Sequence, residues 1–279
     1  MKVRDITAVI EEFAPLTIQE SWDNSGLLIG SPEDEVTGVL VGFDCTPELV
    51  DEAVSKGCNM VVTHHPLIYK GVKRINSKDP VGAAIVKAVK AGVAVYAAHT
   101  TADKVIEGVS GAMAAKLGLK DVQILEPDAD GSGLGCIGNM PKPMTGEEAL
   151  EYVRKAFGLK VIRHSKPVAG TITRVAVMGG SGGSEIQAAM AAGAQLYITG
   201  DISYHNFFTP EGFMIMDIGH FESEVGIVDI FLSKIRKIFP NFAVLKSAVL
   251  ERSNPVRYYG IAAQAGNDAD NKGNDADNK

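Results

Sequence analysis

Met60-Val61-Val62-Thr63-His64-His65-Pro66 is an apolar, β-branched run that ends in two histidines and a proline. A short run of this kind, bounded by turn residues, predicts a buried strand of a parallel sheet. Neighbouring residues of a regular strand face opposite sides, so both imidazoles can face one site only if the strand ends before them. Pro66 favours that ending, because it restricts His65 and cannot donate a hydrogen bond to a sheet. An isolated His-His pair is more often one core and one surface residue, but the rest of the chain reverses that expectation.

The residues before this run complete a strand-helix-strand unit. A strand is expected at 39–44, and Thr46-Pro47-Glu48 has the cap, the early proline and the early acid of a helix start. That helix ends at Gly57, immediately before the histidine strand, which predicts a right-handed βαβ crossover. Upstream, the apolar spacing predicts an amphipathic helix over 5–14, capped by Asp5.

Two further strands also end in a histidine. The strand expected at 93–98 is followed by His99, and Asp103 comes four residues later. The strand expected at 213–218 leads to His220, and Glu224 follows at the same offset. Since ligands of open α/β sheets bind beyond the carboxyl ends of the strands, these side chains are candidates for one shared site.

The chain contains an internal duplication. Shifted by 136 residues, the first strand-helix-strand unit matches the stretch 174–201 without a gap, and Gly57 meets Gly193. The His64-His65 pair then falls on Gly200-Asp201, and the next strand repeats at a shift of 121. We therefore expect two similar α/β lobes related by pseudo-symmetry, with mixed sheets flanked by helices and a metal site in the cleft between them.

The Asp- and Gly-rich stretch 126–135 is the expected boundary between the halves. Residues 1–126 would form the first lobe and residues 127–260 the second, whose C-terminal helix at 231–239 could pack back on the first. Residues 266–272 are repeated letter for letter at 273–279, so the tail 261–279 is expected to be disordered or an artificial addition.

Composition limits the class of protein. The chain has 279 residues, 46% of them hydrophobic and 22% charged, as in soluble globular proteins. The net charge of −7 argues against broad nucleic-acid binding. Three cysteines without CxxC spacing fit a reducing compartment and provide no thiolate site. No signal peptide or membrane-spanning run is recognisable, so we expect a cytoplasmic protein.

The candidate ligands are imidazoles and carboxylates, a set that suits Zn, Fe, Mn or Co. They are His64, His65, His99, Asp103, His220 and Glu224. These six groups are too many for one closed structural site, and they suit two divalent ions about 3.5–4 Å apart. The expected chemistry is hydrolysis of a C–N or P–O bond.

Two other groups could bind a substrate. The basic cluster Lys70, Lys73 and Arg74 follows the histidine strand and is either a solvated loop or a clamp for an anion such as phosphate. Asp23 and Asn24 lie beside the only tryptophan and are either turn residues or part of the site.

Six motifs carry a resemblance to a known family. They are Glu20-x-Trp22-Asp23-Asn24-x-Gly26, the stretch 63–69, Ala98-His99-Thr100-x-x-Asp103, the stretch 179–184, Thr199-Gly200-Asp201, and Gly219-His220-x-x-x-Glu224. Over residues 1–260 the chain resembles the Nif-three-like proteins, also called GTP cyclohydrolase 1 type 2 homologues, in the short bacterial form without an inserted middle domain. The resemblance implies two α/β lobes, a dinuclear metal site between them and ring-shaped homohexamers.

The same resemblance assigns roles to the candidate ligands. It implies that His64 and Asp103 hold one metal, that His65 and His220 hold the other, and that Glu224 bridges both. His99 would lie in or beside the coordination sphere and could act as a catalytic proton shuttle. The chain departs from the family at 101–102, where Thr and Ala replace the usual Asn and Leu; this bears on substrate contacts and leaves the ligand spacing intact.

Three functions fit this pattern. The first is a hydrolase that opens the imidazole ring of GTP and releases formate, with the cluster 70–74 holding the triphosphate. The second is the same metal chemistry on another nucleotide, a phosphoester or an amide; the loop 179–184 would then bind phosphate, unless it is only a tight turn. The third is a non-catalytic, metal-stabilised ring that binds protein or nucleic-acid partners, although no basic stripe other than 70–74 is present.

Overall fold

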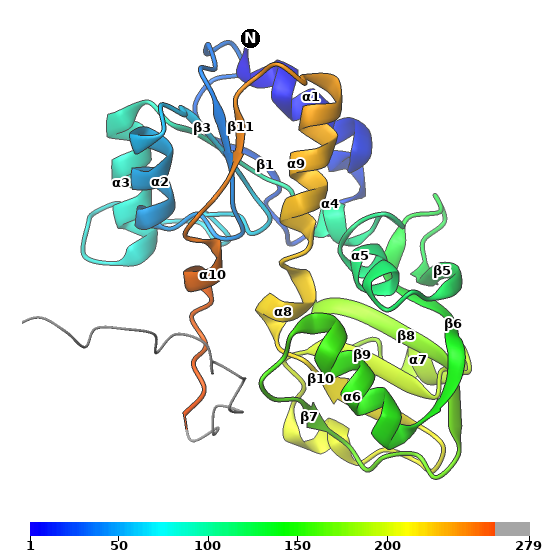
Figure 1. Cartoon of the computed structure of the whole chain (residues 1–279). Helices are drawn as coiled ribbons and strands as arrows, with labels where there is room; N and C mark the ends of the chain where they lie inside the picture. The colour runs from blue at the N-terminus through cyan, green and yellow to red at the C-terminus, as the bar shows by residue number, and fades with distance from the viewer. Residues whose placement is uncertain (260–279) are drawn as a thin grey trace, which may run out of the picture.

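The computed structural model describes residues 1–259, which form two α/β lobes, one above the other in Figure 1. The strands of the upper lobe are β1 (Gly26–Ile29), β2 (Val39–Val41), β3 (Met60–Thr63), β4 (Ala94–Ala97) and β11 (Val244–Lys246). Those of the lower lobe are β5 (Lys120–Pro127), β6 (Gly133–Thr145), β7 (Arg163–His164), β8 (Thr171–Ser181), β9 (Leu196–Gly200) and β10 (Met214–Asp217). The orders are β1-β4-β3-β2-β11 and β5-β6-β8-β9-β10-β7, so each lobe has its own mixed sheet.

The helices connect these strands and cover the sheets. They are α1 (Val3–Phe13), α2 (Pro47–Ser55), α3 (Pro80–Ala91), α4 (Thr100–Asp103), α5 (Val109–Lys116), α6 (Gly146–Phe157), α7 (Ile186–Ala191), α8 (His220–Glu224), α9 (Ile227–Ile238) and α10 (Leu250–Ser253). Two short 3-10 helices, η1 (Leu16–Ile18) and η2 (Tyr204–Phe207), complete the fold.

Strand pairing confirms the internal duplication. β2, β3 and β4 are parallel in the first sheet, as are β8, β9 and β10 in the second. Val39 faces Met60, and Val175 faces Leu196, so the two registers are related by the same 136-residue shift. β1 and β7 lie antiparallel to β4 and β10 at the equivalent edges. The two lobes therefore share a scaffold, and the carboxyl ends of their parallel strands define the site.

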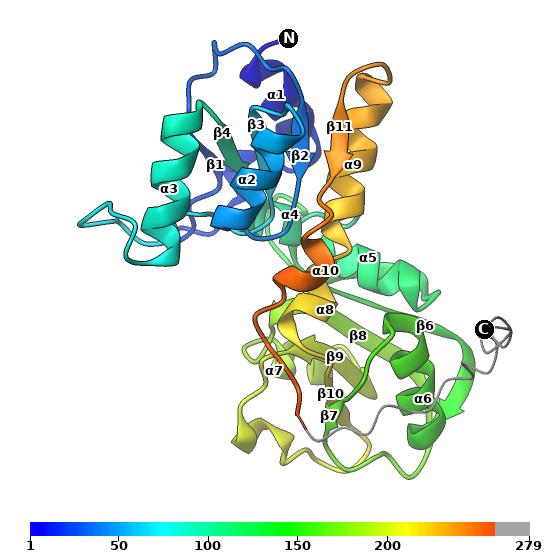
Figure 2. The ribbon, with the colours of Figure 1, turned by 60° about the vertical axis from the view of Figure 1, so that its left-hand side comes forward.

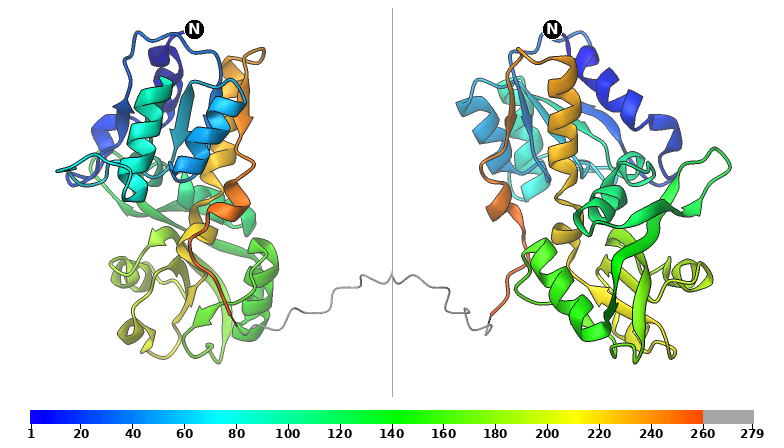
Figure 3. Two further views of the ribbon diagram at one scale, coloured as in Figure 1. Left: turned by 90° about the vertical axis from the view of Figure 1, so that its left-hand side faces the viewer. Right: turned by 45° about the vertical axis from the view of Figure 1, so that its right-hand side comes forward.

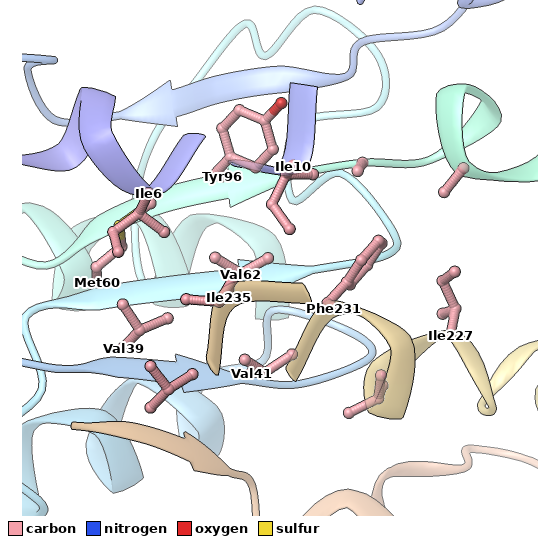
Figure 4. Packing of buried hydrophobic residues seen from close by; sticks show 14 of the residues in the cluster. Ile6, Ile10, Val39, Val41, Met60, Val62, Tyr96, Ile227, Phe231 and Ile235 are labelled. Carbon is pink, nitrogen blue, oxygen red and sulfur yellow. The ribbon is translucent and has the colours of Figure 1, made fainter. Parts of the chain in front are cut away.

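Both faces of the first sheet are covered by helices. On one face, apolar side chains of α1 and α9 pack against β2, β3 and β4 (Figure 4). Ile10 and Phe231, for example, are fully buried there, and each such burial contributes about 1.5–3 kcal/mol. α2 and α3 cover the other face. The C-terminal helix α9 thus packs on the first sheet, and β11 joins that sheet beside β2.

The second sheet is covered by α5 and α6 on one face and by α7 on the other. The stretch 126–135, expected to be a linker, is instead the tip of an antiparallel hairpin between β5 and β6 (right panel of Figure 3). Asp128 and Ser132 close its turn, and Gly131 and Gly133 provide the positive φ angles that the turn requires. The expected lobe boundary after residue 126 therefore falls at the end of a strand that pairs within the second sheet.

Helix starts follow the predicted capping chemistry with one correction. Thr46 caps α2 through its side chain as predicted, and Thr145 caps α6 in the same way. Asp5 is not the N-cap residue of α1; the helix begins at Val3, which is buried, and Asp5 is its third residue, whose carboxylate accepts a hydrogen bond from the N–H of the N-cap residue Lys2 at 2.7 Å. The first helix starts earlier because burial of Val3 extends its apolar face.

After α10 the chain leaves the first lobe and runs along the second to residue 259 (Figure 2). Within residues 1–259, no helix has the length and apolar character needed to cross a membrane. The repeated heptamer of the tail lies outside the described residues.

Candidate metal centre

The strand end at Thr63 directs both adjacent histidines to one place. β3 stops there, and the N–H groups of His64 and His65 both donate to the Phe43 carbonyl, at 3.1 and 3.2 Å. The chain therefore turns instead of continuing its pleat, and the two imidazole rings lie 5.0 Å apart. The expectation that the strand ends before the pair is confirmed.

The other candidates come from the strand-to-helix turns that follow β4 and β10. His99 precedes α4 and Asp103 ends it, whereas His220 begins α8 and Glu224 ends it. Residues four apart lie on one face of a helix, so His220 and Glu224 point the same way. Gly219 has a φ of 93°, which lets the chain turn sharply from β10 into α8.

Glu224 lies at the centre of the cluster. Its Oε2 is 3.0 Å from His220 Nε2, 3.1 Å from His65 Nε2 and 3.7 Å from His64 Nε2. Asp103 also belongs to the cluster, with its Oδ1 3.7 Å from His64 Nε2. All six candidates therefore gather where the two lobes meet, and they form three overlapping groups whose ligand atoms lie within 4.8 Å of one another.

Each histidine is held through its other ring nitrogen. The Nδ1 atoms pair with Ala98 O at 2.9 Å for His64, Asp44 at 2.7 Å for His65, Asp23 at 2.7 Å for His99, and Asp201 at 2.8 Å for His220. With Nδ1–H donating outward, the Nε2 lone pair faces the centre, which is the arrangement that metal-binding imidazoles adopt. Sequence reasoning missed Asp44 and Asp201 as partners, although both follow the end of a strand by at most three residues.

The donor set fits a cation. Within the described part of the chain, the buried His64 Nε2 and Asp103 Oδ1 have no hydrogen-bond partner. Leaving such atoms unpaired is costly, so their presence in a folded core calls for an explanation. These two atoms lie 3.7 Å apart, and a cation bound by their lone pairs would satisfy both of them.

Proton affinities in the cluster are strongly altered. Burial would lower the pKa of His65, but hydrogen bonds to Asp44 and Glu224 outweigh it and raise that pKa to about 10. The pKa of His220 rises to about 9, because the Glu224 interaction outweighs burial in the same way. Burial, reinforced by the charge of Glu224, raises the pKa of Asp103 to about 8. The interactions with His220 and His65, together with the nearby His64 imidazole, overcome burial and hold the pKa of Glu224 well below its usual value. Perturbations of this size are typical of functional sites.

The glycine-rich loop 179–184 makes room for Glu224. A Cβ at Gly180, whose φ is 66°, would overlap Glu224 Oε1, and one at Gly179 would lie 3.0 Å from Glu224 Cγ. Its amides are occupied internally, since Gly180 N donates to Ser223 Oγ and Gly182 N to Thr199 Oγ1. The loop is therefore a tight turn that admits a ligand side chain, and it offers no free amide nest for phosphate.

Asp23 acts on the cluster from behind His99. Its side chain is buried and accepts hydrogen bonds from His99 Nδ1, the Thr100 hydroxyl and amide, and the Ser25 hydroxyl. Burial opposes its charge, but these bonds together lower its pKa. Asn24 Nδ2 donates to the Ile68 carbonyl at 2.5 Å and so connects two loops. Asp23 thus orients His99. Asp23 and Asn24 both position other residues of the site.

The structure does not bring the basic cluster to the centre. Lys70, Lys73 and Arg74 are exposed on the loop before α3, which projects from the first lobe at the left of Figure 2. None of them lines the cavity beside the histidines. Thr101, one of the two departures from the family pattern, is fully buried and does not line it either.

A cavity of about 640 Å³ opens from the cluster, with walls from both lobes. Trp22 and Tyr69 stand on the first-lobe side, and both are within 6.1 Å of the His99 ring centroid. Ser181 and Glu185 contribute to the second-lobe side.

Comparison with known proteins shows the family of this chain. The family model described as Duf34/NIF3 (NGG1p interacting factor 3) matches residues 1–255. The chain belongs to this family. A Clostridium acetobutylicum relative named GTP cyclohydrolase 1 type 2 homolog is 30% identical over 91% of this chain and 97% of the relative. A Lactococcus lactis relative of the same name is 33% identical over 91% and 98%.

Solved structures of similar proteins share the fold. A hypothetical protein of Staphylococcus aureus superimposes with a TM-score of 0.84 at 28% identity, covering 92% of this chain and 99% of that one. Reduced HcgD from Methanocaldococcus jannaschii superimposes with a TM-score of 0.74 at 25% identity, covering 88% and 97%. The two-lobed architecture is therefore that of the family.

Proposed function

We propose that the protein is a hydrolase that works with two divalent metal ions. The observation that carries this proposal is the position of Glu224 Oε2, which lies within 3.7 Å of three imidazole Nε2 atoms whose Nδ1 atoms are already engaged. A buried carboxylate surrounded by preoriented imidazoles suits a bridging ligand.

The residues would divide into two sets of ligands. His64 and Asp103 would hold one ion, His65 and His220 the other, and Glu224 would contact both. Two ions so held can polarise a scissile bond and lower the pKa of water, which is the chemistry of dinuclear hydrolases. Zn, Fe, Mn and Co all suit this donor set.

His99 is the candidate for proton transfer. Its Nδ1 is held by Asp23, so its Nε2 is free to take or give a proton at the wall of the cavity, which the ring lines. A residue that moves a proton must keep one nitrogen oriented and the other accessible to the substrate. Asp23 provides the orientation.

The names of the relatives suggest opening of the guanine imidazole ring, a C–N hydrolysis that releases formate. Other substrates of the same chemistry are a different nucleotide, a phosphoester or an amide. The exposed position of Lys70, Lys73 and Arg74 removes them as a triphosphate clamp within this chain.

The test is an activity screen of protein loaded separately with each of the four metals, against metal-stripped protein. Formate release and phosphate release from a panel of nucleotides, nucleosides and cyclic amides should depend on metal and be lost in Glu224→Gln. Absence of turnover with all four metals would refute the hydrolase. The remaining alternative would be a non-catalytic, metal-stabilised ring that binds partners. In that case Glu224→Gln should leave partner binding unchanged.

We also propose that the chain forms ring-shaped homohexamers in the cytoplasm. Exposed aromatic side chains support self-association, since Tyr204 and Phe208 of the second lobe are largely exposed next to each other. The three cysteines are free and buried, as expected in a reducing compartment. Light scattering of the wild type and of Phe208→Ser would test the assembly.

A further inference from the structure

Two aromatic side chains at the rim of the cavity are exposed to solvent instead of packing in a core. Trp22 is 56% exposed and Tyr69 is 45% exposed. Their ring centroids lie 6.0 Å apart with the planes at 68°, and each also stands at 6.1 Å from His99. Large aromatic groups left in water at the mouth of a cavity offer a surface on which a planar ring can stack.

The opposite wall presents a buried acid. Glu185 is only 6% exposed and lines the cavity next to Ser181 and Ser184. Its Oε2 accepts a hydrogen bond from the Ser184 hydroxyl at 2.7 Å, and no lysine or arginine within residues 1–259 pairs with it. Burial raises the pKa of this carboxyl because no cation offsets the lost hydration. A group in this state is stabilised by neutral N–H donors of a ligand.

Away from the histidine cluster the cavity has no positive charge. Of the described residues that line it, none is a lysine or an arginine, and Glu20 adds a second acid. Lys104, which pairs with Glu20, is itself neutralised, since its Nζ lies 2.7 Å from both Glu20 Oε1 and Asp128 Oδ2. A triphosphate would therefore meet Glu185, which has no ion-pair partner, and Glu20, which shares its one cation with Asp128, so it is repelled over the short range that salt leaves unscreened.

These walls conflict with GTP as the substrate of a ring-opening reaction. Hydrolysis of a ring C–N bond requires the ring to sit at the Glu224 cluster, and a triphosphate held in the cavity would then lie against the remaining lining, which includes Glu20 and Glu185. If the phosphates instead took the cluster, the ring would be held away from the reacting position. A ring without phosphate meets neither difficulty.

We propose that the site takes a planar nitrogen heterocycle without phosphate, a free base or a nucleoside, whose ring stacks on Trp22 and Tyr69 and whose N–H edge donates to Glu185. The inference rests on the proposed function and names its substrate class. A carboxylate can accept two parallel N–H bonds from a purine such as guanine, and hydrogen bonds to a charged group are the stronger kind.

The single tryptophan makes binding directly measurable. Trp22 is the only tryptophan in the chain, so quenching of its fluorescence by a stacked base reports occupancy without any turnover. We expect guanosine to quench metal-loaded protein, and GTP to require at least about tenfold higher concentration because of the acidic wall.

Variants assign the contacts. Glu185→Gln should weaken guanosine binding about tenfold or more, as expected for a lost hydrogen bond to a charged group. Glu211→Gln, at an exposed position of the same lobe, should not change it. Tyr69→Leu should weaken binding and Tyr69→Phe should retain it, and thermal melts would show that each variant is folded.

The proposal is overturned if GTP quenches as well as guanosine, or if folded Glu185→Gln and Tyr69→Leu both bind guanosine like the wild type. If instead the proposal that the protein is a hydrolase is wrong, the result is different. In that case guanosine would still quench Trp22 and respond to both variants, but no metal would support turnover.

Discussion

Replacing Glu224 by Gln removes the one charge that the imidazoles share. In the metal-free protein, Glu224 Oε2 accepts from His220 Nε2 at 3.0 Å and lies 3.1 Å from His65 Nε2. Glutamine keeps the volume of the side chain and loses its charge. The protonated imidazoles that remain would then be buried against a neutral amide, so the variant should be less stable wherever those imidazoles carry a proton.

The size of the effect follows from the altered proton affinities. The rise in the pKa of His65 from 6.5 to about 10 corresponds to about 5 kcal/mol. Asp44 and Glu224 divide that stabilisation, which leaves about 2–3 kcal/mol for Glu224. His220 is 35% exposed, so solvent screening reduces its share to about 1 kcal/mol. We expect Glu224→Gln to cost about 3–4 kcal/mol, as for breaking a buried ion pair.

The pH dependence of the loss in unfolding free energy distinguishes this electrostatic explanation from a simple loss of packing. A raised folded-state pKa contributes stability that is complete below pH 6.5 and disappears as the pH rises through the folded values of about 9 and 10. Urea unfolding of the metal-free wild type and variant should therefore differ most near pH 6. By pH 10 the difference should vanish or reverse, because a buried Glu224 without protonated partners is itself unfavourable. An equal cost at pH 6 and pH 10 would refute the reasoning.

Other predictions concern the groups around the cluster. Asp44→Asn should lower metal affinity about 10–100-fold in competition with a chelator, because the amide no longer fixes the ring that it contacts. Gly180→Ala should abolish metal binding in the same assay and cost well over about 1 kcal/mol in urea unfolding, since its Cβ would overlap Glu224. Gly193→Ala has a similar positive φ but open space around it, so it should cost only about 1 kcal/mol and leave metal binding intact. Alanine at all three basic positions of 70–74 should change stability by less than about 0.5 kcal/mol, as measured by thermal unfolding, and leave metal content unchanged.

The residues of the cluster could be found from the sequence because their position follows from local rules. A β-branched run predicts a strand, and a histidine after such a run must lie at one edge of a parallel sheet. His99 and His220 could be recognised in this way, and the spacing to Asp103 and Glu224 is that of one helical turn. The register pairs Val39 with Met60 and Val175 with Leu196, so the duplication was also readable.

What could not be predicted depends on contacts between distant segments. Asp44 and Asp201 orient imidazoles 21 and 19 residues away, and nothing in their local sequence separates them from ordinary turn residues. The hairpin of β5 and β6 was hidden because its turn has the composition of a linker. The direction in which the basic loop 70–74 points depends on the packing of α3, which no local pattern encodes.

The duplicated scaffold explains why one carboxylate, and not two, occupies the centre. The 136-residue shift pairs Gly180 with Asp44 and Asp201 with His65, so equivalent positions carry unlike groups. In the first lobe Asp44 fills its position and holds His65. In the second lobe the same position is a glycine, and the Glu224 side chain, which is one methylene longer than Asp103, extends into the space so left. The site is thus built from symmetric strand ends whose asymmetric residues let a single acid from one lobe reach imidazoles of both.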